Sequence, residues 1–128
     1  MRLHDARLVR PADFDRVFAR NQRARTDSIV VMACPNQVGH PRLGMVIAKR
    51  LLARAVDRNR VKRCVRESFR QALPTLPACD FVVRLIAKPV AGDEPRDLSR
   101  YFKRAGERAM AIWHTAPAGD VAPDPSPN

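Results

Sequence analysis

Apolar and polar residues recur along the chain in two kinds of pattern, and together they predict six elements of secondary structure. Three stretches carry apolar residues at every third or fourth position, which is the spacing of one buried face of a helix. Three shorter runs are rich in β-branched residues, as strands are. Helices are predicted at residues 11–20, 52–72 and 95–114, and strands at residues 28–34, 42–48 and 80–87.

The segments between these elements carry residues that turn a chain. Residues 35–41 contain Asn36, Gly39 and two prolines, and a loop of this length favours an antiparallel pairing of the strands on either side of it. The first two predicted strands are therefore expected to be neighbours in one sheet. Residues 21–27 are polar and basic, which predicts a loop or a short strand.

The order of the elements, α-β-β-α-β-α, predicts an α+β fold. We expect a single-domain α/β sandwich, in which one sheet is packed against helices. The length of 128 residues suits one domain, which is expected to span residues 1–114. Residues 115–128 are rich in Pro, Ala and Asp and are expected to form a disordered tail.

The charge of the chain indicates a polyanionic partner. Twenty-four Lys and Arg against thirteen Asp and Glu give a formal net charge of +11, which favours nucleic acid or an anionic membrane surface. Arg outnumbers Lys, and its planar guanidinium matches phosphate and stacks on bases. This bias favours nucleic acid, although a GC-rich genome would also raise the Arg content.

The remaining residue types disfavour several classes of protein. Three cysteines without a CxxC pair disfavour a disulfide framework and a zinc site, and the histidines are scattered. No apolar run approaches the ~20 residues that a membrane-spanning helix needs. The N-terminus lacks the apolar stretch of a signal peptide. The protein is therefore expected to be cytoplasmic, with no membrane partner.

The predicted helix at residues 52–72 separates charge from apolar residues. On a helical wheel, Arg58, Lys62, Arg66 and Arg70 form an i, i+4 ladder on one side. Like charges at this spacing repel, and a bound polyanion would relieve the repulsion. The alternative is the solvated face of a surface helix. The opposite face carries Val61, Cys64, Val65 and Ser68, with Phe69 on the border.

The sequence of this helix resembles that of the bacterial ribonuclease P protein family. Residues 58–60, Arg-Asn-Arg, followed by Val-Lys-Arg and by Arg-Glu-Ser-Phe-Arg at residues 66–70, are similar to the family signature known as the RNR motif. The strand Gly-Met-Val-Ile-Ala-Lys at residues 44–49 and the pair Phe14 and Phe18 also match. The resemblance extends over about residues 7–110.

The resemblance implies a topology and an RNA partner. Family members form one α/β sandwich with a left-handed β-α-β crossover through the basic helix, whereas sequence alone would predict the right-handed form. The helix, together with a basic pair before it, would contact ribonuclease P RNA. Glu67 lies where it could pair with Arg60 or Arg63. The implied RNA-binding residues are Lys49, Arg50, Arg58, Asn59, Arg60, Lys62, Arg63, Arg66 and Arg70.

The resemblance also implies a cleft between the first helix and the sheet that holds the 5′ leader of precursor tRNA. Phe14 and Phe18 match an aromatic pair that lines this cleft, and Met32 stands where some members carry an aromatic residue. Aromatic rings there could stack on bases. The alternative for both phenylalanines is packing in the core. Both interpretations hold if the rings form the cleft wall, and we expect at least one ring to be partly accessible.

The sequence shows no evident catalytic constellation, because paired carboxylates, a Cys-His pair and a Gly-rich phosphate loop are all missing. The resemblance implies an accessory protein subunit of an endoribonuclease, whose RNA subunit matures the 5′ end of tRNA with Mg²⁺ held mainly by RNA. No DNA partner is expected. One alternative is a non-catalytic RNA-binding module such as a ribosomal protein. Another is a self-sufficient nuclease that uses Asp13, Asp15, Asp80 and His40.

Overall fold

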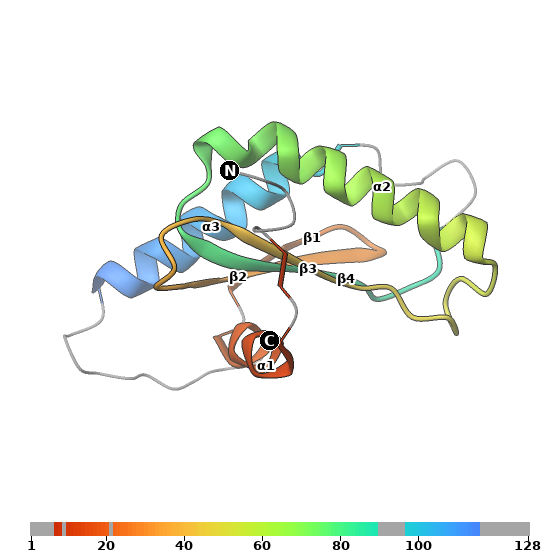
Figure 1. Cartoon of the computed structure of the whole chain (residues 1–128), viewed down its shortest axis with the longest axis horizontal. Helices are drawn as coiled ribbons and strands as arrows, with labels where there is room; N and C mark the ends of the chain where they lie inside the picture. The colour runs from red at the N-terminus through yellow and green to blue at the C-terminus, as the bar shows by residue number, and fades with distance from the viewer. Residues whose placement is uncertain (1–6, 9, 21, 90–96, 116–128) are drawn as a thin grey trace.

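The structure is a computed structural model, which describes residues 7–8, 10–20, 22–89 and 97–115. A four-stranded sheet lies at its centre, with helix α1 on one face and helices α2 and α3 on the other (Figure 1). This is the predicted α+β sandwich. The helices are α1 (Pro11–Arg20), α2 (Ala55–Ala72), the 3₁₀ turn η2 (Leu73–Thr75) and α3 (Ser99–Thr115), and the strands are β1 (Gln22–Arg25), β2 (Ile29–Pro35), β3 (Arg42–Val46) and β4 (Cys79–Leu85).

The strand order in the sheet is β1-β2-β4-β3. Strand β2 pairs antiparallel with β1 and with β4, whereas β3 pairs parallel with β4. The predicted antiparallel pairing of β2 with β3 is therefore wrong, because β4 lies between them. Strand β4 is buried at every position except Arg84, as suits a strand at the centre of a sheet, where both faces are covered.

Strand β1 adds one element to the predicted order, which becomes α-β-β-β-α-β-α. Its Ala24 is buried beneath α3, while the neighbouring Arg25 is exposed on the opposite face. A strand with a single apolar residue gives almost no alternation in the sequence, which is why the segment could equally be a loop. The predicted tail at residues 115–128 lies outside the described residues, except for Thr115, which ends α3.

Helix α2 carries the chain from β3 to the parallel strand β4 beside it, as a parallel pair requires. The left hand of this crossover stays a prediction. The helix begins at Ala55 rather than at residue 52, because the amides of Leu51 and Leu52 donate to the carbonyl of Ala48 and form a turn there.

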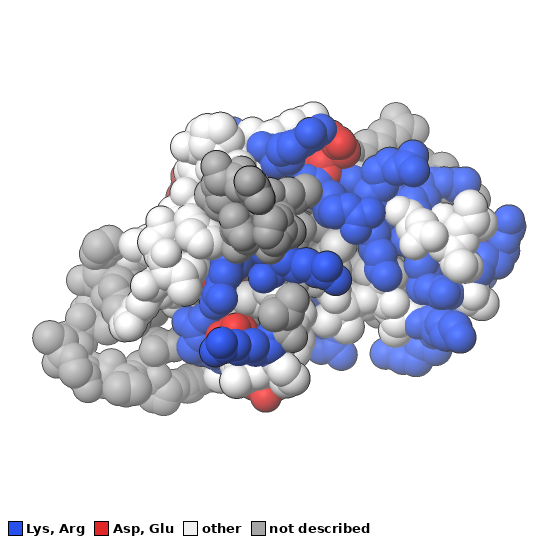
Figure 2. All heavy atoms as spheres, in the orientation of Figure 1, with Lys and Arg blue, Asp and Glu red and all other residues white. Residues whose placement is uncertain are grey.

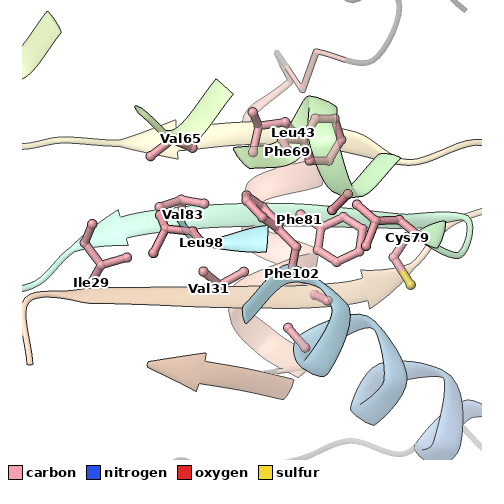
Figure 3. Packing of buried hydrophobic residues seen from close by; sticks show 14 of the residues in the cluster. Ile29, Val31, Leu43, Val65, Phe69, Cys79, Phe81, Val83, Leu98 and Phe102 are labelled. Carbon is pink, nitrogen blue, oxygen red and sulfur yellow. The ribbon is translucent and has the colours of Figure 1, made fainter. Parts of the chain in front are cut away.

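The larger core lies between the sheet and the pair α2 and α3. Phe69 of α2, Phe81 of β4 and Phe102 of α3 are fully buried and meet edge to face, with ring centroids 5.4–6.1 Å apart (Figure 3). Such aromatic pairs add about 0.5–1.5 kcal/mol each beyond the area that they bury. This cluster fixes α2 on the sheet and so determines which face of the helix remains exposed.

A smaller core lies on the other face of the sheet, beneath α1. Val17 of α1 is fully buried against Val30, Met32 and Val82 of the two central strands. Successive residues of a strand point to opposite faces, so β2 supplies Ile29, Val31 and Ala33 to the larger core and Val30, Met32 and Cys34 to this one.

Candidate nucleic-acid interface

Helix α2 buries its apolar face and exposes its basic face, as the helical wheel predicts. Val61, Val65 and Phe69 lie in the larger core, while Arg63 and Arg66 are exposed. Lys and Arg side chains gather where α2 begins, on the right of the view (Figure 2). The burial of one side of the helix thus presents the other side as a basic surface.

The structure brings most of the predicted RNA-binding residues onto this surface. Lys49 and Arg50 are exposed in the turn that follows β3. Lys62, on the helix, is half-buried. The exposed members on the helix are Asn59, Arg60, Arg63, Arg66 and Arg70. We call this set, with Lys49, Arg50 and Lys62, the α2 surface.

Arg58 differs from the other members of the predicted ladder. Its guanidinium Nη1 donates to the carbonyl oxygens of Leu52 and Ala53, at 2.9 and 2.8 Å. The side chain is half-buried and closes the turn before α2. Arg58 therefore holds the turn against the helix, a structural task that the sequence pattern did not reveal.

Ion pairs neutralise part of the α2 surface. Glu67 pairs with Arg70, with oxygens 2.7 and 2.8 Å from Nη2, so the predicted pairing of Glu67 with Arg60 or Arg63 is wrong. Arg60 instead lies 3.9 Å from Asp57. The carboxylate of Glu67 reaches Arg70 because both side chains lie one turn apart on the exposed side. Within the described residues, Lys62, Arg63 and Arg66 have no carboxylate partner.

The aromatic pair of α1 lies on the opposite face of the sheet. Phe14 and Phe18 are both half-buried, with ring centroids 6.5 Å apart. Phe14 lies on the backbone of β3, where a Cβ added to Gly44 would come within 2.6 Å of two ring atoms. The predicted accessibility of at least one ring is confirmed. Both rings also pack against the smaller core, so one part of each side chain is buried and another part faces solvent.

Met32 does not share this accessibility. It is 4% exposed and belongs to the smaller core beneath α1. Its predicted position in the lining of a leader cleft is therefore corrected, because α1 covers the side chain from solvent. Met32 supports α1 from below instead.

Two arginines on the α1 side of the sheet, Arg84 beside Phe18 and Arg25 in the same row of strand residues, were missed in the sequence. Arg25, Val30, Arg84 and Val46 are register partners across β1, β2, β4 and β3. Val30 and Val46 belong to the smaller core, so this row lies on the α1 face, where both arginines are exposed. The guanidinium carbon of Arg84 lies 5.9 Å from the centroid of the Phe18 ring. The available signal was that Arg84 interrupts an apolar run, since a charge in a buried strand must reach solvent.

A buried carboxylate fixes α1 to the sheet. Asp80 is fully buried and accepts two hydrogen bonds from Arg42, at 2.7 and 2.8 Å. It also accepts from Arg16 of α1 and, at 2.8 Å, from Asn36. The hydrogen bond with Asp80 raises the pKa of Arg42. The charge of Asp80 is thus balanced by Arg16 of α1 and Arg42 of β3, and Asn36 in the loop after β2 adds a further hydrogen bond.

The residues proposed for a self-sufficient nuclease do not assemble into one centre. Asp13 contacts Arg42, at 3.6 Å, and so joins the salt-bridged cluster, while Asp15 is exposed. His40 lies against the carbonyl of Pro41. In the part of the chain that the structure describes, no three His, Cys, Asp or Glu side chains are arranged to hold a metal ion. No described helix is both long and apolar enough to cross a membrane.

Comparison with known proteins identifies a family. The family model described as Ribonuclease P matches residues 3–109. A ribonuclease P protein component from Pasteurella multocida is 49% identical over 109 residues, covering 84% of this chain and 90% of the relative. One from Salmonella arizonae is 45% identical over 104 residues, covering 81% and 87%.

Solved structures agree with the sequence relatives. A Staphylococcus aureus RNase P protein superimposes with a TM-score of 0.58 at 25% identity, covering 85% of this chain and 93% of that one. The RNase P protein from Thermotoga maritima gives a TM-score of 0.55 at 28% identity, covering 83% and 93%.

Proposed function

The chain belongs to the ribonuclease P protein family, and from this premise we propose how its two surfaces divide the work of the enzyme. It is a subunit of ribonuclease P, an endoribonuclease of tRNA processing, and ribonuclease P RNA is its partner. The observation that carries the proposal is the placement of a basic helix and a half-exposed aromatic pair on opposite faces of one sheet.

The α2 surface binds ribonuclease P RNA through its phosphates. Lys62, Arg63 and Arg66 lack carboxylate partners among the described residues, so their charge is available to a polyanion. Phosphate contacts of this kind are independent of sequence, and each releases condensed counterions from the nucleic acid. Lys49 and Arg50 extend the basic surface beyond the start of the helix.

The α1 face receives the single-stranded 5′ leader of precursor tRNA. Phe14 and Phe18 are accessible enough to stack on bases and are held in place by the core behind them. Stacking on an aromatic ring contributes roughly 1–3 kcal/mol per base and tolerates any base, since every base has a π-face. This tolerance suits a substrate class whose leaders differ in sequence.

The RNA subunit carries out the cleavage, with this chain as an accessory subunit in the cytoplasm. Mg²⁺, which prefers phosphate oxygens and water, supplies stabilisation of charge when it is bound, and we propose that RNA holds it. The residues of this chain suit that division. The oxygens of Asp80 are taken by Arg16, Arg42 and Asn36, so they are committed to the fold.

Reconstitution tests this proposal. The full chain, freed of RNA by nuclease treatment, is combined with a bacterial ribonuclease P RNA and a precursor tRNA at low Mg²⁺. We expect removal of the leader only when both subunits are present, because the protein neutralises phosphates that would otherwise require more Mg²⁺.

Two results would contradict the proposal. Cleavage by the RNA-free protein alone would move catalysis to the protein. An RNA subunit whose cleavage at low Mg²⁺ gains nothing from the protein would remove the accessory role. The Lys62→Ala/Arg66→Ala protein is the matched control, since it should fold and yet fail to stimulate at protein concentrations that saturate the unmodified complex.

A further inference from the structure

The row formed by Arg25, Val30, Arg84 and Val46 carries two arginines that have no carboxylate partner among the described residues. We propose that Arg25 and Arg84 form a two-point phosphate clamp, which holds the backbone of the leader across the sheet while a base stacks on the aromatic pair. This inference rests on the leader site proposed above. It adds the residues that would bind the phosphodiester backbone there.

The register places both arginines on one face. Arg25 is opposite Val30, and Val30 is opposite Arg84. Directly opposed residues in a sheet share a face. Neighbouring strands lie about 4.7–4.9 Å apart, so the two arginine backbones stand roughly 10 Å from each other, with one apolar residue between them. Long, flexible side chains on such a base can hold successive groups of an extended chain.

The residue between the two arginines is apolar and covered, because it belongs to the smaller core. Val30 is 4% exposed, and Val46 continues the row on β3. Among the described residues, neither arginine has a carboxylate partner. The nearest acidic residue to Arg25 in the sequence, Asp27, is exposed in the β1–β2 turn and makes no ion pair with it. The two charges are therefore unbalanced.

The position of Arg84 suits a nucleotide on Phe18. Its guanidinium carbon lies over the Phe18 ring, 5.9 Å from the ring centroid. A planar guanidinium forms paired hydrogen bonds with a phosphate and also tolerates an aromatic neighbour. A base on the ring and its phosphate on the arginine would then belong to the same nucleotide.

Solvated charge on a basic protein is the competing explanation, and salt dependence separates the two. The chain carrying Arg25→Gln, Arg84→Gln or both is reconstituted with ribonuclease P RNA, and the affinity for precursor and mature tRNA is measured over a salt series. Each phosphate contact to a single strand contributes about −0.7 to the slope of log K against log salt. The slope for precursor tRNA should flatten by about 0.7 for each single variant and about 1.4 for the double variant, with no change for mature tRNA.

Two further variants serve as controls for charge and for position. Arg84→Lys keeps the charge and should keep the slope. Arg100→Gln removes an exposed arginine from α3, on the other side of the sheet. It should leave the affinity for both tRNAs and its salt dependence unchanged. Thermal melting of each protein checks that the fold is intact.

Phe18→Ala, measured in parallel, separates the clamp from the leader site. If Phe18→Ala weakens binding of precursor tRNA selectively while the arginine variants leave its slope unchanged, the clamp is wrong and the leader site stands. If neither Phe18→Ala nor the arginine variants alter the preference for precursor tRNA, the leader site is wrong as well. Equal loss for both tRNAs in the arginine variants would also overturn the clamp, since it would place the contacts outside the leader.

Discussion

Arginine has opposite functions in two regions of the molecule, the cluster around Asp80 and helix α2. Arg16 of α1 and Arg42 of β3 both bind the fully buried Asp80, and their charge holds the helix to the strands. On α2, Arg63 and Arg66 are exposed and have no carboxylate partner among the described residues. A buried, paired charge is costly to disturb, whereas an exposed one contributes little to stability and stays available to a ligand.

The comparison shows that the net charge of +11 is not a uniform property of the surface. Some of the twenty-four Lys and Arg are paired inside the fold, as Arg16 and Arg42 are with Asp80, and others form exposed pairs such as Arg70 with Glu67. Cations without a carboxylate partner among the described residues include Lys62, Arg63 and Arg66 of the α2 surface and Arg84 beside Phe18.

The largest effect is expected from Asp80→Asn. The substitution keeps the shape of the side chain but leaves two half-buried guanidinium groups around a neutral partner. Breaking a buried ion pair from one side costs about 3–5 kcal/mol, and we expect a loss of this size in the free energy of unfolding, measured by urea denaturation.

Glu67→Gln is the matched control for Asp80→Asn. It removes a carboxylate from an arginine in the same way, but both partners are more than half exposed. Exposed pairs contribute about 0–1 kcal/mol, so this variant should be nearly as stable as the unmodified chain. If the two variants lost a similar free energy of unfolding, the distinction between the buried Asp80 cluster and the exposed pairs of α2 would be wrong.

Gly44→Ala should lower the free energy of unfolding by an amount between those of Asp80→Asn and Glu67→Gln. The added Cβ would lie 2.6 Å from the Phe14 ring, so the ring or the strand must shift. Overpacking of this kind costs typically about 1–3 kcal/mol in the free energy of unfolding.

A double-mutant cycle checks the cause of the Gly44→Ala effect. In a Phe14→Leu background, the same Gly44→Ala substitution should cost clearly less, because the group it collides with is gone. Equal costs in the two backgrounds would show that Phe14 does not lie on β3 at this point.

Lys62→Ala/Arg66→Ala should change stability least and RNA binding most. Surface substitutions usually alter the free energy of unfolding by less than about 0.5 kcal/mol. Two lost phosphate contacts should flatten the slope of log K against log salt for ribonuclease P RNA by about 1.4. Arg70→Ala is the comparison variant, and its smaller expected change follows from the pairing of Arg70 with Glu67. An unchanged slope in the folded double variant would exclude phosphate contacts by these two residues.

Local patterns in the sequence predicted the elements whose signal is local. Helix α1 at residues 11–20 has the predicted bounds, and α2 ends at Ala72 as expected. The separation of the basic and apolar faces of α2 is likewise confirmed, since Val61, Val65 and Phe69 are buried. These features depend on residues three and four apart, which a helical wheel displays directly.

Features that depend on distant residues could not be predicted in this way. Asp80 finds its partners 38, 44 and 64 residues away in the sequence, so its apolar surroundings gave no hint of a salt-bridged cluster. The position of β4 between β2 and β3 also depends on contacts between residues far apart in the sequence. The capping of the turn by Arg58 was hidden because a ladder of like residues suggests a single function for all of them.

The central claim is that the two faces of the sheet bind different RNAs, and a crossed measurement tests it most directly. Affinities for ribonuclease P RNA, and the ratio of affinities for precursor and mature tRNA in the reconstituted complex, are measured for Lys62→Ala/Arg66→Ala and for Phe18→Ala. We expect the first variant to lose affinity for ribonuclease P RNA. We expect the second to keep that affinity and lose roughly 1–3 kcal/mol of preference for the leader-bearing tRNA. If Phe18→Ala instead unfolds, or if both variants lose both kinds of binding to the same extent, the division between the α2 surface and the α1 face is wrong.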